Sequence, residues 1–158
     1  MSTRKRQIIQ KIIDSLKLID GGSENLPNSP RSPYKFTSNV YNNVFSKQEF
    51  LDNINDFPSV FCYSITPETR NRIGGRETYC SFIIEIRGYV QGENPIGLAS
   101  DLGQDIQYII ESIKYRCGSN LGLVECRTES LSTDEGLLEP YGVVELRTLI
   151  VYIQDYDI

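Results

Sequence analysis

Three arginines stand within seven residues of one another, on both sides of a glycine pair. Arg70, Arg72 and Arg76 flank Gly74-Gly75 in a polar, turn-rich stretch. Guanidinium groups make paired hydrogen bonds to carboxylates that lysine cannot reproduce. The cluster is therefore a candidate contact with acidic groups on a partner surface. The alternative is a solvated loop, which is the usual state of an exposed charge run.

Two neighbouring carboxylates, Asp134 and Glu135, belong to the residue types that general acid–base catalysis uses. They directly precede Gly136, and acidic residues are common in turns for conformational reasons. The sequence contains no histidine, which excludes Ser-His-Asp triads, Cys-His pairs and histidine metal sites. Phosphate-loop and dinucleotide-binding glycine motifs are also missing. We expect no enzyme, no cofactor and no metal, and we keep Asp134 and Glu135 as candidate partner contacts.

The four cysteines Cys62, Cys80, Cys117 and Cys126 are too widely spaced for a Cys-x-x-Cys metal or redox motif. We expect them to be small buried hydrophobes in a reducing compartment. No stretch of the chain resembles a signal peptide or a membrane span. The sequence therefore predicts a protein made and used in a cytoplasm, or built into a particle there.

Charge and tyrosine content bear on the partners. A formal net charge of -5, from 16 basic and 21 acidic residues, argues against a protein that wraps nucleic acid. Tyrosine occurs 10 times, and tyrosine is enriched in protein interfaces. Tyr79 and Tyr89 alternate with charges on the less apolar face of a predicted strand. Both are candidate contacts with a neighbouring subunit, and packing in the core or at a sheet edge is the alternative.

The elements that must position these residues follow from periodicity. Apolar residues at three- and four-residue steps predict a helix over 3–19, capped by Thr3 or Ser2, and a second over 96–117. The buried stripe of the second helix is Leu98, Leu102, Ile106, Ile109, Ile110 and Ile113. A brief helix is predicted over 46–55, with Ser46 as its cap and Phe50, Leu51 and Ile54 facing inward.

Strands are predicted over 40–45, 59–65, 77–91, 122–130 and 142–153, with a polar turn at 132–136. The strict alternation over 77–91 indicates a half-buried antiparallel strand, and its length suggests a hairpin arm. Stretches 20–39 and 67–76 are predicted to be flexible loops, mobile in the free subunit and ordered in an assembly. The element order predicts an α+β fold in one domain, 1–158, with an antiparallel β-sheet, two long α-helices packed on one face and a long β-hairpin arm.

Several short motifs resemble those of the tail terminator (tail completion) proteins of long-tailed bacteriophages, and the resemblance covers about residues 1–153. They are Asp105-Ile106, Thr133-Asp134-Glu135-Gly136, Pro140-Tyr141-Gly142, Ile150-Val151-Tyr152, Pro58-Ser59-Val60 and Arg87-Gly88-Tyr89-Val90. The end of the chain, Asp155-Tyr156-Asp157-Ile158, matches no motif of the family.

The resemblance implies a virion structural protein that forms a hexameric ring on the head-proximal end of the tail tube. Such a ring stops tube polymerisation and provides the joining surface for the head and neck. The implied partners are other copies of the chain, the tail tube protein, a neck or head-completion protein and possibly the tail sheath. DNA passes through the lumen without specific binding, which suits a net acidic protein, and no membrane is involved.

Two other functions remain open at this stage. One is another phage neck or connector protein, which would share the fold class and the localisation. The other is a small-molecule-binding regulatory α+β domain, which predicts a preformed apolar pocket and no ring.

Overall fold

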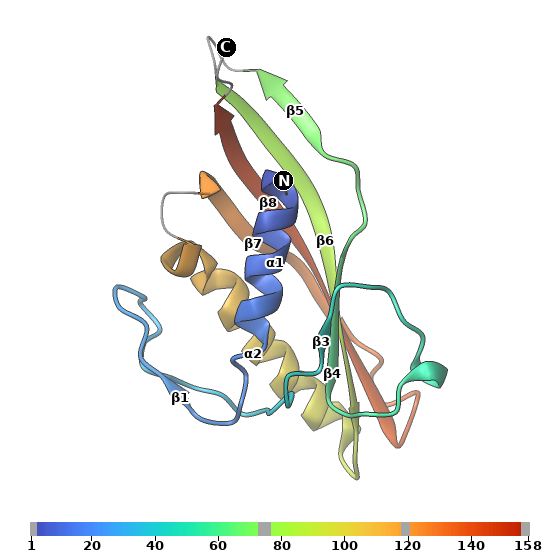
Figure 1. Cartoon of the computed structure of the whole chain (residues 1–158). Coiled ribbons are helices and arrows are strands. Elements are labelled where there is room, and N and C mark those ends of the chain that lie inside the picture. Colours follow the sequence, from blue (N-terminus) through green and yellow to red (C-terminus); the bar gives the residue numbers. More distant parts are fainter. Residues whose placement is uncertain (1–2, 73–76, 118–120, 156–158) are drawn as a thin grey trace.

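The computed structural model describes residues 3–72, 77–117 and 121–155. Two helices lie on one face of a six-stranded, mostly antiparallel sheet with the order β3-β4-β6-β8-β7, and β5 pairs with β6 beside this path (Figure 1). The predicted α+β class is confirmed. The elements are α1 (Arg4–Leu16), β1 (Ser23–Glu24), β2 (Tyr34–Lys35), β3 (Val44–Phe45), η1 (Leu51–Asn53), β4 (Ser59–Ser64), β5 (Thr69–Arg72), β6 (Glu77–Gln91), α2 (Pro95–Cys117), β7 (Leu123–Thr133) and β8 (Tyr141–Asp155).

The first helix begins where the sequence predicted. The Thr3 side chain accepts a hydrogen bond from the Arg6 backbone N–H at 3.3 Å, which satisfies one free donor of the first turn. The α-helix ends at Leu16, three positions earlier than predicted, because the next amides bond three residues back: Ile19 N–H donates to the Leu16 carbonyl. Ile19 is nevertheless fully buried, so the apolar periodicity identified the right residues.

Strands β6 and β8 form the spine of the sheet. Each has 15 residues, and they pair in antiparallel register from Glu77 opposite Asp155 to Gln91 opposite Tyr141. This confirms the strand predicted over 77–91. Phe82 and Ile84 lie on the buried, helix-bearing face, as alternation requires.

The second helix packs closely on this spine because two glycines leave room for it. A Cβ at Gly88 of β6 would lie 2.6 Å from Leu102 Cδ2, and a Cβ at Gly103 of α2 would lie 2.9 Å from Val144 Cγ2. The predicted buried stripe of α2 is confirmed except at Leu98, which is 40% exposed. A side chain at either glycine would push helix and sheet apart.

The predicted 40–45 strand and 46–55 helix are wrong in extent and type. Only β3 forms in the first, and it pairs in parallel with β4, which makes the sheet mixed. In the second only the short 3-10 helix η1 forms, and Phe50 is 66% exposed instead of facing the core. The Glu49 carboxylate accepts from the Phe50 amide at 3.2 Å and from the Asn53 side chain at 3.0 Å. These local bonds stabilise a single tight turn. A longer amphipathic helix would need more buried apolar residues than this segment has.

Part of the predicted loop over 67–76 is a strand. Residues Thr69–Arg72 form β5, which pairs with β6 at Thr78–Ser81. Because β4 covers the same edge of β6 only from Ile84 onward, β5 satisfies backbone groups that would otherwise lack partners. Positions 73–76 of that prediction lie outside the described residues.

The last two strands run further than predicted. Strand β7 continues to Thr133, so the predicted turn at 132–136 starts at Asp134, and β8 begins at Tyr141. Cys62 and Cys80 are fully buried as predicted, while Cys117 and Cys126 are half-buried, and all four thiols are free.

Candidate assembly surfaces

The sheet face opposite the helices carries a charged network that the sequence analysis missed. Arg87 of β6 donates to Glu85 on its own strand and to Glu145 on β8, both at 2.9 Å. Glu85 is only 6% exposed. Burial acts to raise the pKa of Glu85, but its side-chain hydrogen bonding, which includes the bond from Arg87, outweighs that effect and holds the pKa below its usual range. The three residues face outward from the paired strands β6 and β8, and Arg87 lies directly opposite Glu145. The alternation of side chains along each strand, combined with the correct pairing of the two strands, would have predicted this network.

A groove of about 370 Å³ lies beside this network, where the outer sheet face meets the η1 segment and the β7–β8 turn. Exposed apolar side chains, Phe50 and Leu138, line it together with Tyr89 and Asp134. Asp134 organises the turn, since its carboxylate accepts from the Leu138 and Val143 amides at 3.2 Å and 3.1 Å. This is a half-apolar surface that neither α1 nor α2 covers.

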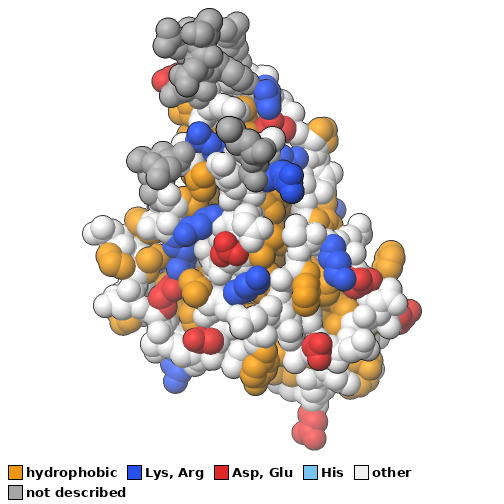
Figure 2. Space-filling model, viewed as in Figure 1, with side chains coloured by type: hydrophobic (Ala, Val, Ile, Leu, Met, Phe, Trp, Pro, Cys, Tyr) orange, Lys and Arg blue, Asp and Glu red, His pale blue; other side chains and the backbone are white. Residues whose placement is uncertain are grey.

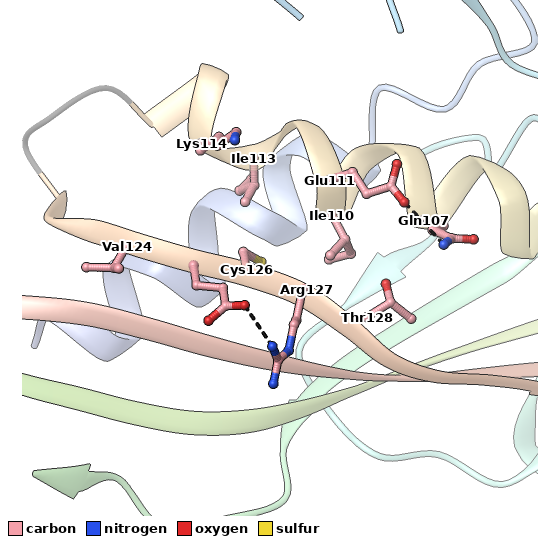
Figure 3. Close-up of a pocket in the computed structure, with 10 residues that line it drawn as sticks. Gln107, Ile110, Glu111, Ile113, Lys114, Val124, Cys126, Arg127 and Thr128 are labelled. Atoms are coloured by element: carbon pink, nitrogen blue, oxygen red, sulfur yellow. Dashed lines mark hydrogen bonds and ion pairs between the residues drawn. The ribbon is translucent and has the colours of Figure 1, made fainter. Parts of the chain in front are cut away.

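A second groove, of about 290 Å³, lies between α2 and the edge strand β7 (Figure 3). Its wall on the helix includes Gln107 and Glu111, which are hydrogen-bonded to each other at 3.2 Å. Its wall on the strand includes Cys126 and Arg127, and Arg127 pairs with Glu125 at 3.1 Å. Burial raises the pKa of the Cys126 thiol, which favours its neutral, less nucleophilic form.

Acidic and basic side chains are interspersed over the face seen in Figure 2, with no large field of one sign. Such a surface does not suit nucleic-acid wrapping, in agreement with the net charge of -5. Within the described ranges, no cluster of three or more metal-ligating side chains is arranged to hold an ion. Neither of the two described helices combines the length and hydropathy that a membrane-spanning segment needs.

The described part of the predicted arginine cluster lies on β5, beside the first residues of β6. Arg70 is on β5, where it pairs with Glu68 at 2.8 Å and its side chain stays 53% exposed. The backbone of Arg72 pairs with Thr78, whereas its side chain and the whole of Arg76 lie outside the described residues. Tyr79 is on the adjacent strand and is 37% exposed.

The remaining predicted contacts lie at the other end of the sheet. Tyr89 is only 3% exposed: within the subunit it packs edge-on against Phe61 and donates to the Glu49 carbonyl at 2.8 Å, and its contact with a neighbouring subunit stays a prediction. Glu135 is exposed in the turn with a positive φ of 54°. The structure therefore brings Tyr89 and Asp134 into one groove and leaves Arg70 and Tyr79 far along the sheet.

Comparison with known proteins identifies the family of the chain. A search of curated proteins found no matching relative. The family model described as bacteriophage tail tube terminator protein matches residues 5–157, almost the whole chain. The chain therefore belongs to the bacteriophage tail tube terminator protein family.

Proposed function

We propose that this terminator, a non-enzymatic virion protein that caps the phage tail tube, does so as a closed ring of six copies. The ring stops tube polymerisation at the head-proximal end and offers the joining surface for the neck. The tail tube is the partner that family membership supplies. The number of copies and the neck contact come from the resemblance of the sequence motifs.

A closed ring needs a heterologous interface, in which one patch of a subunit meets a different patch of the next copy. The observation that best supports the ring is the presence of two unlike grooves on different sides of one subunit. One is the half-apolar groove on the outer sheet face, and the other is the more polar groove between α2 and β7. Both grooves are open to solvent. The two helices and the sheet share one hydrophobic core, so both grooves lie on a single packed unit.

Further contacts are assigned by the sequence analysis. We propose that Arg70, Arg72 and Arg76 contact acidic groups of the tube or of the adjacent subunit, and that Tyr79, near the start of β6, contacts a neighbouring subunit. Glu135 and Asp134, at the opposite end of the sheet, are placed against a second partner. The net negative charge suits a conduit through which DNA passes without being bound.

Electron microscopy of purified tails tests the arrangement, with the subunit located by a small tag. We expect a six-fold ring at the head-proximal end. An open arrangement, or a position elsewhere on the particle, would contradict the proposal.

A matched pair of variants tests the groove on the outer face. Leu138→Glu places a charge in the groove, whereas Leu98→Glu changes a leucine of similar exposure, 40% against 43%, that does not line it. Complementation of a terminator-deficient phage with Leu138→Glu should yield overlong or headless tails, and Leu98→Glu should restore infectivity. Equal infectivity of the two variants would remove this groove from the assembly surface.

A further inference from the structure

Residues 20–39, named here the strap, leave the end of α1 and return to almost the same point. Asp20 and Asn39 form an isolated antiparallel bridge, and the Val40 amide donates to the Ile19 carbonyl at 3.0 Å. Between these ends the strap contains the short β1–β2 pair and carries Phe36, which is 2% exposed. A long loop whose ends meet in this way can behave as a unit separate from the elements that it connects.

One carboxylate on α2 holds the returning half of the strap. Asp105 is fully buried, and its oxygens accept from the Tyr34 hydroxyl at 2.8 Å, the Thr37 amide at 3.1 Å and the Ser38 amide at 2.8 Å. All of these donors come from the strap, and no described Lys or Arg forms an ion pair with this carboxylate. A buried charge is tolerated only when hydrogen bonds replace its water, so Asp105 and the closed strap depend on each other.

A second attachment lies further along the same helix. The Tyr34 ring stacks on Tyr108 with centroids 3.9 Å apart and an interplanar angle of 4°. Glu24, at the start of the strap, accepts from the Tyr108 hydroxyl at 2.6 Å and from Arg116 at 2.9 Å. Burial raises the pKa of Tyr108 to about 12, so its hydroxyl remains a donor at neutral pH.

From these contacts we propose that the strap is folded in the free subunit before assembly, with Asp105 as the positioning residue that latches it to α2. The proline, glycine and serine content of 20–39 predicted a loop that orders on docking. The contacts with Asp105, Tyr108 and Arg116 instead fix the strap at points along α2 that are 11 positions apart, about 16 Å of helix. The entropy of ordering is then lost during folding of the subunit, and partners meet a preformed projection.

Loss of the latch should loosen the strap without disrupting the sheet. Because the two ends of the strap are joined at the bridge between Asp20 and Asn39, opening does not require any strand of the six-stranded sheet to separate. The strap is therefore a local conformational unit, attached to α2 at Asp105 and again around Tyr108 and Arg116.

Amide hydrogen exchange on the free, monomeric subunit tests the proposal without any assembled particle. In the wild type we expect the Phe36, Thr37 and Ser38 amides to be protected, since each donates to a defined acceptor. Asp105→Asn keeps the shape of the side chain but replaces one acceptor oxygen with a donor. It should raise exchange in the strap roughly tenfold or more, as expected for the loss of hydrogen bonds to a charged group.

The control is Gln104→Ala, which changes an exposed position of α2 directly next to Asp105. Protection of β6 and β8 should be unchanged in both variants, which separates loss of the latch from a general loss of stability. Should Asp105→Asn unfold the whole subunit, Tyr34→Phe removes a single hydroxyl donor and should give a smaller increase confined to the strap.

Strap amides that exchange like an unstructured peptide in the free wild type would overturn the proposal. So would strap protection in Asp105→Asn equal to that in the control, or in Tyr34→Phe where Asp105→Asn does not fold. Neither result bears on whether the protein caps the tail tube as a ring, because only the isolated subunit is measured.

Discussion

Arg116 and Glu24 form a two-point ion pair across 92 positions of sequence, with Arg116 Nη1 lying 2.9 Å from Glu24 Oε2. The pair joins the last turn of α2 to the strap, and the Arg116 side chain is only 7% exposed. The hydrogen bond from Arg116 is the main reason that the pKa of Glu24 lies below its ordinary value of 4.5; burial opposes this shift, and the bond from Tyr108 adds to it.

This relationship predicts a pH dependence of stability. A carboxyl group with a lowered folded-state pKa contributes stability that is complete above its unfolded pKa and is lost as pH falls through the folded value. At neutral pH, Glu24→Gln should lower the free energy of unfolding by roughly 1–2 kcal/mol. Below the pKa of an ordinary glutamate, the difference between wild type and variant should shrink. Urea denaturation of both proteins over a pH series measures it, and a pH-independent difference would contradict the assignment.

The close packing of α2 on β6 predicts that Gly88 tolerates no side chain. In Gly88→Ala the new Cβ would lie 2.6 Å from Leu102 Cδ2 and 3.0 Å from Val144 Cγ1. We expect a loss of about 1–3 kcal/mol in the free energy of unfolding, because helix and sheet must separate. The control is Gly22→Ala, whose Cβ would face only the exposed Asp20 side chain at 3.1 Å. Thermal denaturation of both variants measures the difference in stability. Equal unfolding midpoints would mean that the interface between α2 and β6 accommodates the extra methyl group without loss of stability.

The charged network on the outer sheet face can be compared with a more exposed arrangement of the same kind. Arg87 lies between Glu85 and Glu145 and is 24% exposed, whereas Arg127 lies between Glu125 and Glu129 and is 57% exposed. Arg87→Met should cost roughly 1–3 kcal/mol, because two partly buried carboxylates lose their shared cation. Arg127→Met should cost less than about 1 kcal/mol. Chemical denaturation gives both values. A larger loss of stability in Arg127→Met would contradict the expectation that the less exposed arginine contributes more.

The arginine cluster should matter for assembly more than for folding. Replacing Arg70, Arg72 and Arg76 together with Ala should change the free energy of unfolding by less than about 1 kcal/mol, since exposed ion pairs contribute little. In phage complementation the triple variant should produce overlong tails or tails that fail to join heads. Full infectivity with normal tail length would exclude the cluster as a docking surface, and a misfolded variant would assign the arginines a structural role.

The sequence by itself determined the elements whose side chains repeat with a local period. The three- and four-residue steps of α1 and α2 and the alternation over β6 each report which face of one element is buried, and that information needs no knowledge of neighbours. The absence of histidine and of nucleotide-binding motifs can likewise be seen without knowledge of the fold. The family resemblance also rested on short contiguous motifs. The family match over residues 5–157 confirmed that resemblance.

Tertiary structure decided what depends on a distant partner. Residues Thr69–Arg72 are a strand because part of the β6 edge would otherwise be unpaired. Tyr89 is buried on the outer sheet face because Phe61 packs against its ring and the Glu49 carbonyl accepts from its hydroxyl. The sequence predicted a mobile loop over 20–39 because the residues that hold it, Asp105 and Arg116, lie about 70 to 90 positions away. Hydrogen bonds and ion pairs of this kind have no period along the chain, so only the folded arrangement brings their donors and acceptors together.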